Sequence, residues 1–201
     1  MKILVLGATG RTGRLIVEAA EAAGHEVTVA IRAPHGPEGV TSVPLDLRDA
    51  ERIRAAAGRA EAVISALASG RGNPACSTLA RALLPMEGLR FVSIGGAGVD
   101  APGDAKAMPD RIVGWVMRRI VGEMLADRQA EHDMLAGSAL RWTMLRPPRL
   151  TDAPGQGGYR LTHETPAGTA IARRDLAQAA VDVLSDADTW GRAPFVAGGR
   201  A

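Results

Sequence analysis

The sequence predicts an α/β protein built on a doubly wound parallel sheet with helices on both faces, and two observations predict it. Short apolar runs alternate along the chain with segments whose apolar residues recur at helical spacing. Strands that alternate with helices through short links form parallel sheets covered by helices. The second observation is a glycine-rich turn between the first apolar run and the first helical segment. Together they predict a ligand site where the first strand ends.

The turn follows a strand expected over Lys2–Leu6 and carries three regularly spaced glycines. Gly7 lets the chain leave the strand sharply, Gly10 leaves room for a pyrophosphate at the backbone, and Gly13 lets the helix lie close to the strand. The helix then points its free N–H groups and the positive end of its dipole at the phosphates. The turn therefore predicts dinucleotide binding.

Further elements continue the alternation. Strands are predicted over Val27–Ile31, Val40–Leu45, Ala62–Leu67, Leu89–Ile94 and Arg141–Leu145. Helices are predicted from Gly13 to Gly24, over Ala50–Ala57 with Asp49 as N-cap, over Asn73–Pro85, and from Asp110 to about Ala136. Within the last of these, Trp115 and Met124 are expected to lie in the core or in a pocket wall. The glycine- and proline-rich stretch Gly95–Pro109 is expected to be a long functional loop.

The remainder of the chain is expected to lie on the substrate side. The segment from about residue 147 begins with a glycine-rich loop up to Gly158 and a strand over Tyr159–Thr162. A helix capped near Asp175 and a terminal strand over Pro194–Ala197 follow. Neither an internal repeat nor a linker divides the chain, so one domain over residues 1–201 is predicted.

Composition excludes several functions. The net charge is +2, with 22 arginines against two lysines, and aromatic residues make up 3%, so the stacking platforms of a nucleic-acid-binding protein are lacking. No apolar stretch reaches the roughly 18 residues that a membrane span needs. Cys76 is the single cysteine. No metal site is predicted, a buried structural thiol is preferred to a nucleophile, and a cytoplasmic location is expected.

The second strand indicates which nicotinamide cofactor is bound. Proteins that prefer NAD place an acidic residue near its end for the ribose 2′-hydroxyl, but no Asp or Glu occurs between Val27 and Pro37. Arg32, with Arg11 from the glycine turn, instead offers guanidinium groups for a 2′-phosphate. NADP is therefore expected, the alternative being that Arg32 is an ordinary surface arginine. Asp46, after the third strand, either accepts from the adenine amino group or caps a turn.

Several of these motifs together resemble a known family. Gly7–Gly13, Val27–Arg32, Asp46-Leu47 and above all Leu140–Pro147 resemble the atypical short-chain dehydrogenase/reductases. The sequence is most similar to the small NAD(P)H-binding proteins related to NmrA-like regulators and to flavin reductase, also called biliverdin reductase B. The resemblance implies a Rossmann-like sheet and extends over nearly the whole chain.

The resemblance also implies positions for the cofactor. Asp46 and Leu47 would contact the adenine, Ala66 and Leu67 the adjoining ribose, and Pro147 the nicotinamide. The pyrophosphate and 2′-phosphate would be bound by Gly7, Thr9, Gly10, Arg11, Thr12, Gly13 and Arg32.

The catalytic pair of that family is missing. Typical short-chain dehydrogenases use a tyrosine four residues before a lysine, and those places correspond here to Met124 and Arg128. The one tyrosine is Tyr159, so ordinary ketone–alcohol chemistry is not expected. Hydride transfer to a flavin or quinone asks less of the protein, because the acceptor is electron-poor and solvent supplies protons.

Three residues remain as weak catalytic candidates. Arg149, where flavin reductases carry a histidine, either attracts an anionic acceptor or pairs with Asp152. His132 is either a proton donor or a surface residue, and Ser93 is either a hydroxyl near the substrate or a structural one. The sequence thus predicts an NADPH-dependent reductase of a flat small molecule. The alternative is a non-catalytic NADP(H) sensor with a protein partner.

Overall fold

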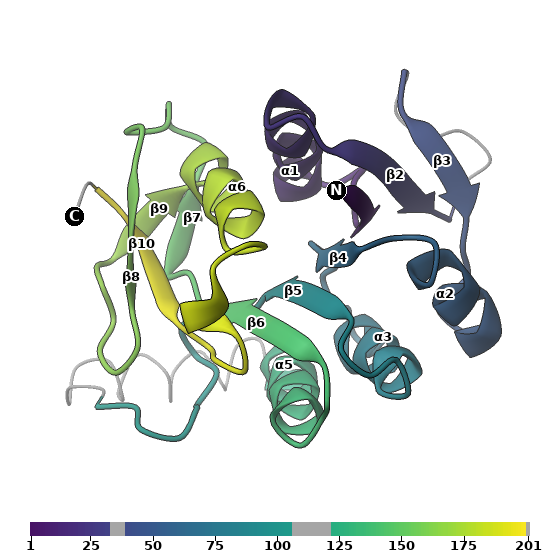
Figure 1. Ribbon diagram of the computed structural model, residues 1–201. Coiled ribbons are helices and arrows are strands. Elements are labelled where there is room, and N and C mark those ends of the chain that lie inside the picture. The colour runs from purple at the N-terminus through teal and green to yellow at the C-terminus, as the bar shows by residue number, and fades with distance from the viewer. Residues whose placement is uncertain (33–38, 106–121, 200–201) are drawn as a thin grey trace.

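The computed structural model describes residues 1–32, 39–105 and 122–199. Its centre is a parallel sheet of six strands in the order β3-β2-β1-β4-β5-β6 (Figure 1). The strands are β1 (Lys2–Leu6), β2 (Glu26–Ile31), β3 (Thr41–Pro44), β4 (Ala62–Ser65), β5 (Arg90–Ile94) and β6 (Arg141–Leu145). Strand order reverses between β1 and β4, and ligands bind at such a switch point in open α/β sheets. The predicted doubly wound, Rossmann-like fold class is confirmed.

Helices cover both faces of this sheet (Figure 1). Helices α1 (Arg11–Ala22) and α6 (Arg173–Asp182) pack together over one face, where Ile3, Val5 and Ile64 point. Helices α2 (Ala50–Ala57), α3 (Ala75–Leu83) and α5 (Gly122–Ala136) cover the face where Val63 and Phe91 point. Alternate strand residues therefore belong to two separate hydrophobic layers, as a sheet buried on both sides requires.

Local signals predicted several element boundaries well. The Asp49 carboxylate accepts from the Arg52 N–H at 3.0 Å and caps α2 as expected, and Gly24, with φ of +79°, ends α1. Helix α6 begins at Arg173, so Asp175 lies in its first turn rather than before it. The predicted loop over 33–39, the beginning of the 110–136 helix and Trp115 lie wholly or mostly outside the described residues.

The part of the chain after β6 forms two small sheets that were only partly predicted. Strand β8 (Tyr159–Thr162) pairs antiparallel with β10 (Phe195–Gly198), while β7 (Arg149–Thr151) pairs parallel with β9 (Ala170–Ala172). A 3₁₀ turn spans Ala187–Thr189. Figure 1 shows this unit beside α6 at the β6 side of the main sheet. Residues that follow the carboxyl end of β6 are thereby brought near the end of β1.

Candidate functional site

The glycine turn connects β1 to α1 at the switch point. Gly7 has φ of +78°, and a Cβ there would lie 2.7 Å from the Ala66 carbonyl carbon. A Cβ on Gly13 would lie 2.1 Å from the Gly7 oxygen, so only glycine allows this approach of helix to strand. A Cβ on Gly10 would meet only the Gly7 oxygen, at 3.2 Å, because the outer side of the turn is open. The backbone of this turn is accessible to a ligand.

The N-terminus of α1 above this turn suits an anion. Gly10 provides no side-chain cap and the first turn contains no acidic residue. In the described structure, the backbone N–H groups of Arg11, Thr12 and Gly13 have no hydrogen-bond partner. Three unpaired N–H groups at the positive end of a 12-residue helix favour phosphate. The residues present therefore fit the pyrophosphate of a dinucleotide, and Thr9 lies exposed beside them.

The adenine side of the expected site is exposed. Arg32 lies in solvent directly after β2. The Asp46 carboxylate accepts from the Arg48 N–H at 2.9 Å, which is the turn-capping alternative, while its second oxygen can still receive a bond. Leu47 is half-buried against the α2 side of the core. Ala66, which donates its N–H to the Leu6 carbonyl, and Leu67 continue β4 beside the turn.

A buried polar cluster lies beneath the ends of β4 and β5. Its acidic centre is Asp127 of α5, whose carboxylate accepts from the hydroxyls of Ser69 and Ser77 and from the N–H groups of Cys76 and Ser77. Burial alone raises the pKa of Asp127, but these hydrogen bonds more than offset it and hold that pKa below its ordinary value. The carboxylate thus fixes the start of α3 to α5.

Arg128 and Glu131 form the second half of this cluster. Arg128 Nη1 lies 2.8 Å from Glu131 Oε2, and its Nη2 donates to the Leu67 carbonyl at the expected ribose position. Burial raises the pKa of Glu131, although the neighbouring Arg128 guanidinium acts in the opposite direction. The sequence indicates only the position of Arg128 relative to the family's lysine. Asp127 and Glu131 were not predicted as part of a site, because acidic residues on a helix ordinarily face solvent.

Two of the three catalytic candidates are buried. Ser93 is fully buried and its hydroxyl, like that of Ser65 across from it on β4, has no partner in the described structure. This hydroxyl makes no structural hydrogen bond within the described residues, so both alternatives for Ser93 stay predictions. His132 is 3% exposed and packs edge-on against Trp142 at 5.7 Å, so its assignment as a surface residue was wrong. A ring enclosed in the core is also poorly placed to donate a proton to a ligand.

Cys76 and Met124 have opposite environments. Cys76 is buried as expected, and burial raises the pKa of its thiol to about 11, which keeps it protonated and unreactive. Met124 is 40% exposed, so it does not lie in the core, and the other expectation, a place in a pocket wall, stays a prediction. Its thioether has no proton to give at the position that corresponds to the family's tyrosine.

The segment after β6 forms the other wall of the site. The loop after β5 pairs with it, since Gly95 N–H donates to the Leu145 carbonyl and Ala97 N–H to the Pro147 carbonyl, both at 2.8 Å. Arg146, 1% exposed, anchors this wall through two bonds to Asp104, at 2.6 and 2.7 Å. Pro147 is thus held at the carboxyl edge between β5 and β6.

Asp152 connects this segment to the glycine turn. Its carboxylate lies 3.0 Å from Arg11 Nη1 and 2.6 Å from Arg173 Nη1. The proposed pairing of Asp152 with Arg149 is therefore wrong: Arg149 is exposed in β7, and the two arginines that bind Asp152 come from α1 and α6. The sequence did not predict a role for Arg173, because nothing in the local sequence indicates which acidic residue forms an ion pair with it.

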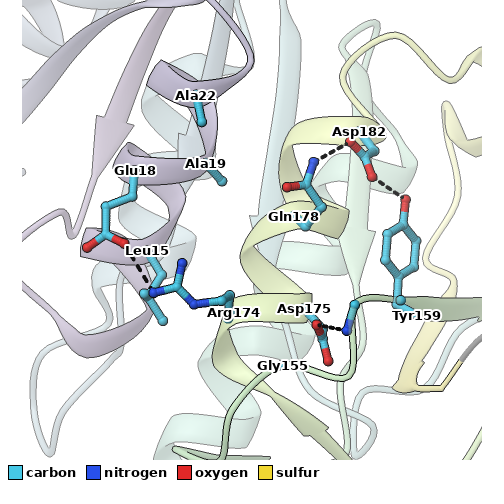
Figure 2. Close-up of a pocket in the computed structure, with 12 residues that line it drawn as sticks. Leu15, Glu18, Ala19, Ala22, Gly155, Tyr159, Arg174, Asp175, Gln178 and Asp182 are labelled. Carbon is cyan, nitrogen blue, oxygen red and sulfur yellow. Dashed lines mark hydrogen bonds and ion pairs between the residues drawn. The ribbon is translucent and has the colours of Figure 1, made fainter.

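A cavity of about 620 Å³ lies elsewhere, along the flank of α1. Figure 2 shows Leu15, Glu18 and Ala19 of α1 on one side of it and Arg174, Gln178 and Asp182 of α6 on the other. There the Tyr159 hydroxyl donates to the Asp182 carboxylate at 2.9 Å. Burial is the main cause that raises the pKa of Tyr159, and the negative charge of Asp182 raises it further. None of the cofactor or catalytic residues expected from the sequence lines this cavity.

Within residues 1–32, 39–105 and 122–199, no group of three or more His, Cys, Asp or Glu side chains is placed to hold a metal ion. Across the same ranges, every helix is too short or too polar to cross a membrane.

Comparisons with known proteins agree with this geometry. A family model described as NAD(P)H-binding matches residues 7–187. Among solved structures, a proposed NADH-flavin reductase from Streptococcus pneumoniae TIGR4 superposes with a TM-score of 0.78 at 23% identity, covering 99% of this chain and 100% of that one. The anaerobilin reductase ChuY from Escherichia coli O157:H7 gives 0.79 at 18% identity, covering 100% and 98%. The oxidoreductase YlbE from Lactococcus lactis gives 0.79 at 17%, covering 100% and 92%. At these identities the similarity shows a shared fold.

Proposed function

The chain belongs to the NAD(P)H-binding family, and from this premise we propose that it is an NADPH-dependent reductase. Its acceptor is a flat, electron-poor small molecule of the flavin or quinone type. The observation that carries the cofactor part is the N-terminus of α1, with three unpaired N–H groups above a glycine turn that leaves the backbone open. When bound, the nicotinamide supplies the hydride.

In this proposal the residues of the chain bind the cofactor and orient it. The turn from Gly7 through Thr9, Gly10, Arg11, Thr12 and Gly13 binds the pyrophosphate. Asp46 and Leu47 contact the adenine, Ala66 and Leu67 the ribose, and Pro147 the nicotinamide. Arg128 holds the Leu67 carbonyl in place from below, and Glu131 holds Arg128.

Arg32 carries the preference for NADPH over NADH. It is exposed at the end of β2 with its guanidinium able to meet a 2′-phosphate. Arg11 was expected to assist, but its guanidinium binds Asp152 and contributes only when that ion pair opens.

The proposed kind of acceptor depends on the proton-donating side chains that the expected catalytic positions offer. Met124 offers no proton, while His132 and Ser93 are buried away from solvent. A carbonyl substrate needs a proton at its oxygen as hydride arrives, whereas a flavin or quinone takes hydride and is protonated from water. Arg149, exposed on β7, faces the acceptor side in this proposal.

The same missing donor favours a second candidate, a non-catalytic NADP(H) sensor that changes protein partners. The test follows NADPH absorbance with purified protein and a panel of flavins, quinones and small aldehydes. The reductase proposal predicts oxidation with flavins or quinones and none with aldehydes. Tight NADPH binding without oxidation by any acceptor would favour the sensor instead.

A further inference from the structure

One carboxylate, that of Asp152, bridges two arginines at the carboxyl edge of the sheet. Its Oδ2 lies 3.0 Å from Arg11 Nη1 and its Oδ1 lies 2.6 Å from Arg173 Nη1. In the described structure neither guanidinium group has another hydrogen-bond partner. The three side chains carry two positive charges and one negative charge, so the group keeps a net charge of about +1.

The fold brings these residues together from three places. Arg11 begins α1 directly after the glycine turn, and Arg173 begins α6. Strands β7 and β9 pair in parallel up to Thr151 and Ala172, so the next residues, Asp152 and Arg173, lie side by side. Neither helix has a side-chain cap at its N-terminus. The positive end of α1, which has no acidic residue in its first turn, thus reinforces Arg11, whereas Asp175 in the first turn of α6 offsets the positive end of that helix.

The Arg11 half of this bridge contributes little to stability because it is exposed to water. The side chains of Arg11 and Asp152 are 66% and 63% exposed, and ion pairs in such places contribute only about 0–1 kcal/mol, whereas the Arg173 side chain is only 12% exposed. An arginine binds the two oxygens of a carboxylate and those of a phosphate in the same geometry. Asp152 therefore occupies the position that an external anion would take.

We propose that Arg11 and Arg173 form a binding site for a phosphate or carboxylate group of the acceptor, with Asp152 as its occupant when no ligand is bound. This inference rests on the proposed reductase function and narrows its acceptor to molecules with an anionic group. The site differs from the Arg149 position, which is three residues earlier and outside the ion-pair group. The acceptor's anion displaces Asp152 from one or both arginines.

The test compares FMN with riboflavin, which differ by one phosphate. Both are titrated into the full-length protein by flavin fluorescence, first alone and then with saturating NADP⁺. FMN is expected to bind about ten-fold tighter than riboflavin, as one charge-assisted pair implies. Arg173→Gln should reduce this preference to about two-fold, and Asp152→Asn should strengthen FMN binding about three-fold without changing riboflavin binding.

Glu18→Gln is the matched control, since Glu18 makes a comparably exposed ion pair with Arg174 at 3.5 Å. It should leave both flavins unaffected. Equal affinity for FMN and riboflavin in the unmutated protein would overturn the inference. Loss of the FMN preference under saturating NADP⁺ would also overturn it, because the phosphate position would then belong to the cofactor. NADP⁺ binding is measured separately by calorimetry, so its absence counts against the proposed function rather than the anion site.

Discussion

At the carboxyl edge of the sheet, the glycine turn consists of backbone groups, whereas the region after β6 consists of charged side chains. The turn from Gly7 to Gly13 binds through its backbone, and its shape depends on contacts between residues near in sequence, down to the 2.1 Å that a Gly13 Cβ would have to the Gly7 oxygen. The proposed acceptor side is made of charged side chains that meet across the fold, since Asp152 joins Arg11 to Arg173. Under the proposed function, such a division keeps the phosphate site constant while the acceptor site is free to change.

The largest effect is expected on the backbone side. Gly13→Ala introduces a methyl group where helix and strand backbones touch, so we expect the free energy of unfolding to fall by about 3 kcal/mol and NADPH binding to be lost. Urea denaturation and calorimetry measure the two quantities. Gly122→Ala is the control, because a Cβ there meets nothing within 4 Å. A Gly13 variant as stable as the control would show that the turn tolerates side chains.

The buried acid of α5 predicts a pH dependence. The pKa of Asp127 is lower in the folded protein than its ordinary value of about 3.9, so its contribution to stability is present above that value and lost as the pH falls through the folded pKa. Asp127→Asn should lower the free energy of unfolding by about 2 kcal/mol at neutral pH. It should also reduce the loss of stability that the unmutated protein shows as the pH falls. Asp133→Asn, exposed on the same helix, is the control for thermal denaturation between about pH 2 and 7. An unchanged acid limb in Asp127→Asn would contradict this assignment.

An intermediate effect should separate the two nicotinamide cofactors. Arg32→Ala should weaken NADPH binding about ten- to a hundred-fold and leave NADH unchanged, because only the 2′-phosphate is lost as a partner. Isothermal titration calorimetry measures both affinities. Arg59→Ala, an exposed arginine after α2, serves as control. If NADPH and NADH bind the unmutated protein equally, Arg32 has no such role.

The smallest effect is expected on the stability of the acceptor side. Asp152→Asn removes the exposed ion pair with Arg11 and replaces the pair with Arg173, whose side chain is 12% exposed, by a neutral hydrogen bond from Arg173 to the Asn carbonyl oxygen. The free energy of unfolding should therefore fall by only about 1 kcal/mol. Urea denaturation measures the change in the free energy of unfolding for Asp152→Asn and for Gly13→Ala under the same conditions. A loss comparable to that of the glycine variant would mean that the bridge is structural, and the contrast between the two sides would disappear.

The sequence predicted correctly those elements that are determined by residues close to one another along the chain. The glycine turn, the Asp49 cap and strand β6 are encoded by neighbouring residues, and each was predicted where it lies. Strands β7 and β9 were missed because three-residue strands form only through their long-range pairing. His132 was misplaced because α5 buries polar residues, including Asp127 and Glu131, and so lacks a clear apolar face.

The acceptor site was the least predictable part for the same reason. Asp152 was expected to meet its sequence neighbour Arg149, but the ladder of β7 and β9 turns it toward Arg173. The partner of Arg11 lies 141 residues away, beyond any local pattern. The absence of a proton donor there, which was inferred from the identity of Met124 alone, stays a prediction.

A single-turnover experiment tests whether NADPH bound at the turn reduces a separate acceptor. Protein loaded with one equivalent of NADPH is mixed rapidly with FMN or a quinone under nitrogen, and the absorbance of NADPH and of the acceptor is followed together. We expect both absorbances to decay at one rate, in equal amounts, and faster than with free NADPH. Bound NADPH that persists unchanged in the presence of every such acceptor would show that the protein is not a reductase of this class.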